Sequence, residues 1–188
     1  MYLLLALLAC GPKGGGPPAA PAAPAAPNAP VAPAAAAIAP MPATLDALRD
    51  ALPTGSHIRL SIWSAGQPTV LQDWTFTECT EESTTIRSKV LTEAGELLVD
   101  EGSSRSPWTE LHQHAAFPAA STTRIESSVD VPIGHYDTWL YTVQAVGDDG
   151  VPIIKRFHFA RTLPGPPVLY TMERQGVEVF RMTMVERS

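Results

Sequence analysis

The sequence predicts a mainly β protein: an antiparallel meander of about nine strands, built as a half-barrel or an open sandwich, with one or two short helices. Three observations carry this prediction. Apolar and polar side chains alternate through most of residues 57–186, short Gly- and Pro-containing turns separate the alternating stretches, and no helical crossovers join them. The chain has 188 residues, of which 45% are hydrophobic, and this length suits one domain with or without a tail.

A short amphipathic helix is predicted over residues 44–52. Leu45, Leu48 and Leu52 fall on one helical face, and Thr44 can accept a hydrogen bond from the first turn as its N-cap. Pro53 ends the segment.

The hydrophobic period then changes from 3.6 to 2. Ile58, Leu60 and Ile62 alternate with polar neighbours, and Trp74 and Phe76 share one face of the next stretch. The expected strands of this half are 57–63, 70–77, 84–92 and 96–100.

A second short helix is predicted over residues 106–118. Ser106 is the expected N-cap, Pro107 suits the first helical position, and Pro118 ends the helix. Trp108 and Leu111 would face the core.

Alternation resumes in the C-terminal half, where Trp139, Tyr141 and Val143 lie on one face. Gly-Asp-Asp-Gly at 147–150 predicts a hairpin turn. The expected strands are 122–131, 136–146, 153–161, 168–173 and 177–186.

Residues 1–10 form an unbroken apolar run that ends in Cys10. The run is too short to span a bilayer and suits an export signal, although its lack of a basic start predicts a true initiator Met further upstream. Leu7-Leu8-Ala9-Cys10 resembles the lipobox of bacterial lipoproteins. The resemblance implies cleavage before Cys10, acylation of its thiol and new amine, and a lipid anchor in the cell envelope. Gly11, rather than Asp, follows Cys10, which in the enterobacterial pattern implies the outer membrane, facing the periplasm or the cell surface.

Residues 11–43 predict a disordered Pro/Ala-rich tether. They hold ten of the 19 Pro and a single charge, Lys13. Pro at every third position excludes both helix and sheet, leaving an extended chain. The segment is either a spacer that lifts the domain from the membrane or low-complexity drift in a GC-rich genome, and in both cases it has no catalytic role.

Residues 44–188 form the single predicted β domain, with 12 basic and 19 acidic side chains, so its net charge is 12 − 19 = −7. This acidic balance argues against nucleic acid as a partner.

No pattern in the sequence predicts a catalytic centre, a metal site or a cofactor. Cys79 is flanked by acidic residues, which favours a structural thiol over a reactive one. His112 and His114 would diverge on a helix, and Asp130 and Asp137 could meet across a turn or lie exposed at strand ends.

Aromatic residues are abundant for nine strands, and they either fill a core or line an apolar groove. The residues assigned to such a groove are Trp74, Phe76, Trp139, Tyr141, Phe157 and Phe159.

The order of elements, together with the lipobox, resembles the half-barrel carriers that ferry or receive lipoproteins in the periplasm and related envelope proteins. The segment Val129–Tyr136 and the paired strands that end at Val185 contribute to this likeness, which is one of element order and transfers no functional residue. The expected function is a lipid-anchored module that binds an apolar ligand or an envelope partner. The alternatives are a structural lipoprotein with a filled core and a hydrolase with a scattered site.

Overall fold

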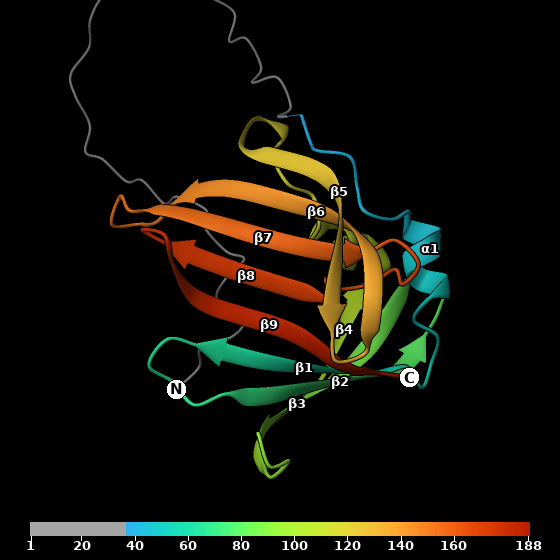
Figure 1. Ribbon diagram of the computed structural model, residues 1–188. Coiled ribbons are helices and arrows are strands. Elements are labelled where there is room, and N and C mark those ends of the chain that lie inside the picture. Colours follow the sequence, from blue (N-terminus) through green and yellow to red (C-terminus); the bar gives the residue numbers. More distant parts are fainter. Residues whose placement is uncertain (1–36) are drawn as a thin grey trace, which may run out of the picture. The chain divides into compact units, whose positions relative to one another are not determined.

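A computed structural model describes residues 37–188, and these form one nine-stranded antiparallel sheet with two short α-helices (Figure 1). The predicted fold class is confirmed. The strands are β1 (His57–Ser64), β2 (Val70–Cys79), β3 (Ser83–Thr92), β4 (Leu97–Pro107), β5 (Thr122–Val131), β6 (Gly134–Val146), β7 (Pro152–Ala160), β8 (Leu169–Arg174) and β9 (Val177–Arg187). The helices are α1 (Leu45–Asp50) and α2 (Trp108–Gln113), followed by the 3-10 turn η2 (Ala119–Ser121).

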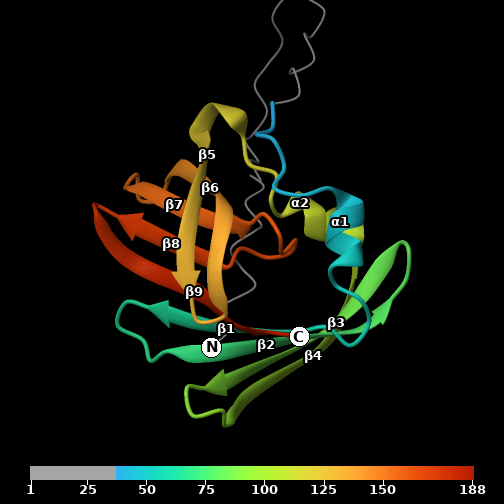
Figure 2. The same ribbon diagram turned by 45° about the vertical axis from the view of Figure 1, so that its right-hand side comes forward.

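The strand order is β4-β3-β2-β1-β9-β8-β7-β6-β5, so the sheet is not one continuous meander. Each half runs as a meander, but the first and last strands pair at the centre, while β4 and β5 occupy opposite edges. The segment that carries α2 connects these two edges. Figure 2 shows the sheet curled around the side on which α1 and α2 lie, and we call that side the inner face.

The core begins at the inner face of β1. Ile58, Leu60 and Ile62 are buried, whereas Arg59, between the first two, and Trp63, after the last, face outward. Because side chains alternate along a strand, this pattern shows which side chains of β1 face inward. Residues that pair directly across neighbouring strands point to the same side of the sheet, so the register then shows which side chains of the other strands face inward.

Helix α1 forms as its sequence predicts. Thr44 accepts a hydrogen bond from the Ala47 N–H at 3.2 Å, and Leu48 and Leu52 are buried. At the other end, the Arg187 side chain of β9 donates to the carbonyl of Ala51 at 2.9 Å. The cap and this contact hold the helix against the end of the central strands.

The second helix is shorter than predicted, because β4 is longer. β4 continues to Pro107 by pairing Ser103–Pro107 with the start of β3, so Ser106 is a strand residue and not the helix N-cap. Pro107 occupies the cap position without a side-chain bond, and α2 ends at Gln113, well before Pro118.

The N-terminal boundary of the domain also differs from the prediction. Residues 37–43, expected to belong to the tether, pack on the sheet: Ile38 bridges Pro118, and Ala39 is buried and donates to the Phe117 carbonyl at 2.9 Å. Residues 37–43 therefore belong to the ordered domain, which was predicted to begin at residue 44. The predicted signal with its Cys10 and the tether up to residue 36 lie outside the described residues. Within residues 37–188, no helix is both long and apolar enough to cross a bilayer.

Candidate functional site

A single line of directly paired residues crosses the inner face from strand to strand, and we call it the inner lane. Each member is the direct cross-strand partner of the next, so all point to the same side of the sheet. From β5 to β2 the inner lane consists of Arg124, Tyr141, Phe157, Tyr170, Met182, Ile62 and Val70. It is apolar or aromatic throughout, except for its first member at the edge strand.

Aromatic rings stack along the middle of the inner lane. The rings of Phe157 and Tyr170 lie parallel, 4.4 Å apart. The ring of Phe180, beside the inner lane on β9, lies 5.1 Å from Tyr170 and is tilted by 48°, and we call these three rings the aromatic stack. All three side chains are half-buried. Desolvation raises the pKa of the Tyr170 phenol to about 12, so this stretch stays uncharged at neutral pH.

Phe117, in the segment between α2 and η2, covers one end of this stack. Its ring lies 4.7 Å from Phe157, 5.5 Å from Tyr141 and 6.4 Å from Phe159. Ala39 completes the cluster from the N-terminal side. This end of the inner face is therefore a packed core.

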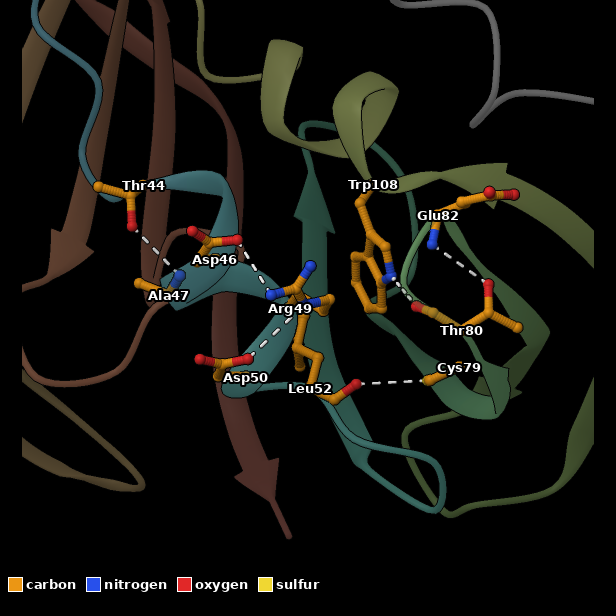
Figure 3. A network of polar contacts seen from close by, with 10 residues as sticks. All are labelled: Thr44, Asp46, Ala47, Arg49, Asp50, Leu52, Cys79, Thr80, Glu82 and Trp108. Atoms are coloured by element: carbon orange, nitrogen blue, oxygen red, sulfur yellow. Dashed lines mark hydrogen bonds and ion pairs between the residues drawn. The ribbon is translucent and has the colours of Figure 1, made fainter.

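Trp108 at the start of α2 covers a second region, over β2. Its indole stacks on Phe76 with ring centroids 6.5 Å apart and an interplanar angle of 6°, and its N–H donates to the Thr80 carbonyl at 2.9 Å (Figure 3). Two separate aromatic side chains from the connection between β4 and β5 thus fill two parts of the curled sheet.

The six residues predicted to line a groove do not form one site. Phe76, Tyr141 and Phe159 are buried, while Trp74, Trp139 and Phe157 are half-buried. Phe76 belongs to the Trp108 region. Tyr141, Phe159, Phe157 and Trp139 belong to the Phe117 cluster.

Three residues of the aromatic stack and its cover lay outside that predicted set, namely Phe117, Tyr170 and Phe180. Phe117 lay in a segment predicted as helix and gave no strand signal. Phe180, Met182 and Met184 alternate with polar residues along β9 and therefore share one face. This alternation could have identified Phe180 as an inner-face residue.

Trp139 lies beside two cations at the β5 edge of the inner face. The guanidinium carbon of Arg124 is 3.7 Å from the ring centroid, and that of Arg161 is 4.7 Å away. Glu126 pairs with Arg161 at 3.6 Å. These cation–π contacts hold the Trp139 side chain in place.

A separate hollow of about 580 Å³ lies outside the inner lane, between α1 and the turn from β2 to β3. It is lined by Arg49, Asp50, Pro53, Thr54, Cys79, Thr80 and Glu81. The Cys79 thiol is half-buried there and donates to the Leu52 carbonyl at 3.4 Å, while Arg49 pairs with Asp46 and Asp50 (Figure 3). The thiol thus joins β2 to the residues that follow α1, whereas the two ion pairs of Arg49 stay within α1.

The other titratable candidates are dispersed. His112 contacts the Ala43 carbonyl at 2.9 Å, and Asp130 bonds His135 at 2.8 Å rather than meeting Asp137. Within the described part of the chain, no three His, Cys, Asp or Glu side chains are grouped so that they could hold a metal ion.

No family model and no curated protein matches the chain. Among solved structures, the chain is similar to a protein in the complex of MucA and MucB from Pseudomonas aeruginosa, with a TM-score of 0.46 and 11% sequence identity. The match covers 77% of this chain and 55% of that one, so this chain spans little more than half of that protein.

Proposed function

We propose that this protein is a lipid-anchored component of the bacterial cell envelope whose β domain binds an apolar ligand, or an apolar segment of an envelope partner, on its inner lane. The observation that carries the proposal is the half-buried stack of Phe157, Tyr170 and Phe180. Phe117 contacts only the first of these three rings, so the stack extends beyond the covered end.

The chemistry of the stack favours an uncharged, flexible occupant. An aromatic side chain buries roughly 150–250 Å² when it is fully covered, and burial contributes about 25 cal/mol per Å². Tyr170 stays neutral at physiological pH, and Met182 beside it adapts to irregular shapes. An acyl chain or an apolar peptide segment satisfies these conditions.

The anchor supports an envelope location. Leu7-Leu8-Ala9-Cys10 resembles a lipobox, and the Ala/Pro-rich residues that follow suit a spacer between the membrane and the domain. Residues 38–40 pack beside the Phe117 cluster, so the spacer joins the domain at the covered end of the inner face.

Titration of the full-length protein with a fluorescent long-chain fatty acid tests the ligand. Tyr170→Lys places a charge in the inner lane, whereas Thr171→Lys places the same charge on the outer side of the same strand. We expect saturable binding that Tyr170→Lys weakens about 10-fold or more and Thr171→Lys leaves unchanged. Circular dichroism shows whether both variants fold. Absence of saturable binding in the unmodified protein, or equal loss in both folded variants, would refute the ligand site.

A structural lipoprotein with a filled core is the second candidate, and the positions of Trp108 and Phe117 favour it. These two side chains already occupy the regions over Phe76 and Tyr141. In this case the purified protein carries no lipid in native mass spectra and binds no fatty acid, while substitution of Phe117 lowers only its stability.

A further inference from the structure

Strand β4 presents an unpaired edge with three consecutive exposed apolar side chains. Leu97, Leu98 and Val99 are 57%, 53% and 51% exposed. β4 is a terminal strand of the sheet, so within the described residues its outer backbone groups have no strand partner (Figure 2). An edge of this kind is a ready template for pairing with another chain.

The opposite edge differs. β5 carries one strongly exposed large apolar side chain, Ile125, which is 57% exposed, and its neighbours in sequence are Arg124 and Glu126. Natural sheets protect their edges with such interspersed charges. The three apolar residues of β4 have no charge between them.

The pairing of β4 with β3 is irregular at this place. Val99 pairs with Val90 and Leu97 with Leu91, so Leu98 is an extra residue without a partner on β3. Because such a bulge leaves its extra residue outside the ladder, Leu98 makes no pairing within its own sheet. The apolar surface of β4 thus has little to contact within the domain.

Acidic side chains flank the apolar residues on both sides. Glu93 and Glu96 precede them in the β3–β4 turn, and Asp100 and Glu101 follow. Asp100 is paired with Arg87 at 2.8 Å, which leaves an excess of negative charge around the exposed apolar run. A partner with apolar residues between basic ones complements this pattern.

The β4 edge of a second copy of the chain complements this pattern of apolar and acidic side chains poorly. If two β4 strands pair antiparallel so that Leu98 faces Leu98, each Glu96 faces an Asp100, and like charges directly opposite are destabilising. If Arg105 instead faces Glu101, Val99 lies opposite Pro107, which has no N–H to donate.

We propose that the β4 edge binds an extended segment of another protein by strand addition, with apolar residues over Leu97–Val99 and Lys or Arg residues beside the flanking acids. Main-chain hydrogen bonds supply affinity, and the acidic flanks select for basic residues. This site is on the edge of the sheet and is independent of a ligand on the inner lane.

Two labelled peptides test the proposal against full-length protein in a mild detergent. One has the sequence Lys-Val-Lys-Leu-Val-Leu-Lys-Val-Lys, and the other has Glu in place of every Lys. We expect the basic peptide to bind, to bind more weakly as salt rises, and to protect the amides of β4 from hydrogen exchange. The acidic peptide should bind at least about 10-fold more weakly.

The matched variants are Leu97→Lys on β4 and Ile125→Lys on β5, because the two original side chains are equally exposed. Leu97→Lys should lower the affinity for the basic peptide about 10-fold or more, and Ile125→Lys should leave that affinity unchanged. Equal binding of both peptides, no binding, or equal effects of the two variants would each overturn the proposal. A dimer in light scattering that Leu97→Lys dissociates would assign the edge to a second copy, and would also overturn it.

Discussion

The indole of Trp108 stacks almost parallel on the ring of Phe76, although 32 positions separate them in sequence. Trp108 is the first residue of α2, and Phe76 lies on the inner face of β2. The Trp108 side chain is 1% exposed, and its N–H has a backbone partner in Thr80. This contact holds the connection between β4 and β5 against the curled sheet.

Trp108→Ala is therefore expected to lower the free energy of unfolding by about 3–5 kcal/mol, because it removes a fully buried ring and leaves the Thr80 carbonyl without its donor. Urea unfolding followed by circular dichroism measures this. Trp63→Ala is the control, since Trp63 is 36% exposed on the outer face and should cost well under half as much. Equal losses would show that the buried Trp108 contact stabilises the domain no more than an exposed tryptophan does.

Tyr141 fastens residues 37–43 to the sheet. Its buried hydroxyl donates to the carbonyl of Pro40. Tyr141→Phe should lower the free energy of unfolding by about 0.5–1.5 kcal/mol. It should also make the segment before Thr44 accessible to proteases. In the unmodified protein we expect limited proteolysis to stop near residue 37. Tyr136→Phe loses only a bond to Ile133, three residues away, and should leave the cleavage pattern unchanged.

Asp73 is expected to make stability depend on pH at the acidic end. Arg59 donates two hydrogen bonds to this carboxylate, at 2.6 and 2.9 Å, and thereby lowers its pKa from the usual 3.8. His57, 3.6 Å away, adds to the lowering of this pKa. Because the folded pKa lies below the unfolded one, the stabilisation is complete above about pH 5 and is lost as the pH falls through the folded pKa.

Asp73→Asn should remove the decrease in the free energy of unfolding that Asp73 causes at acidic pH. At neutral pH it should lower the free energy of unfolding by about 1.5–3 kcal/mol. Unfolding in urea at a series of pH values measures both effects. Asp130→Asn is the control, because Asp130 is 88% exposed and pairs only with His135. An unchanged acid slope in Asp73→Asn would show that this carboxylate does not couple folding to pH.

Cys10→Ser should abolish incorporation of labelled palmitate and release the protein from membranes, because Ser has no thiol to acylate. Cys79→Ser is the matched control, since Cys79 is a free thiol half-buried between α1 and β2. Equal labelling of the unmodified protein and Cys10→Ser would refute the lipobox.

Local sequence determined which side of the sheet most residues face. Alternation in Ile58, Leu60 and Ile62 predicted the buried face of β1, and Thr44 predicted the start of α1. These predictions succeed because the period of 2 and the N-cap each depend on neighbouring residues alone. The same local signals place Tyr141 and Phe157 on one face, but they do not say what covers them.

The tertiary structure alone decided the pairing of β1 with β9, the exposure of the β4 edge, the cover by Phe117 and the packing of Ala39. The β1–β9 pairing and the exposed β4 edge depend on contacts between residues far apart in sequence. The alternation of residues within one strand carries no information about such contacts. Ala39 illustrates the last point. An Ala/Pro stretch is extended both in solvent and along a sheet, and only the contacts with Tyr141 and Phe159 decide that Ala39 packs there.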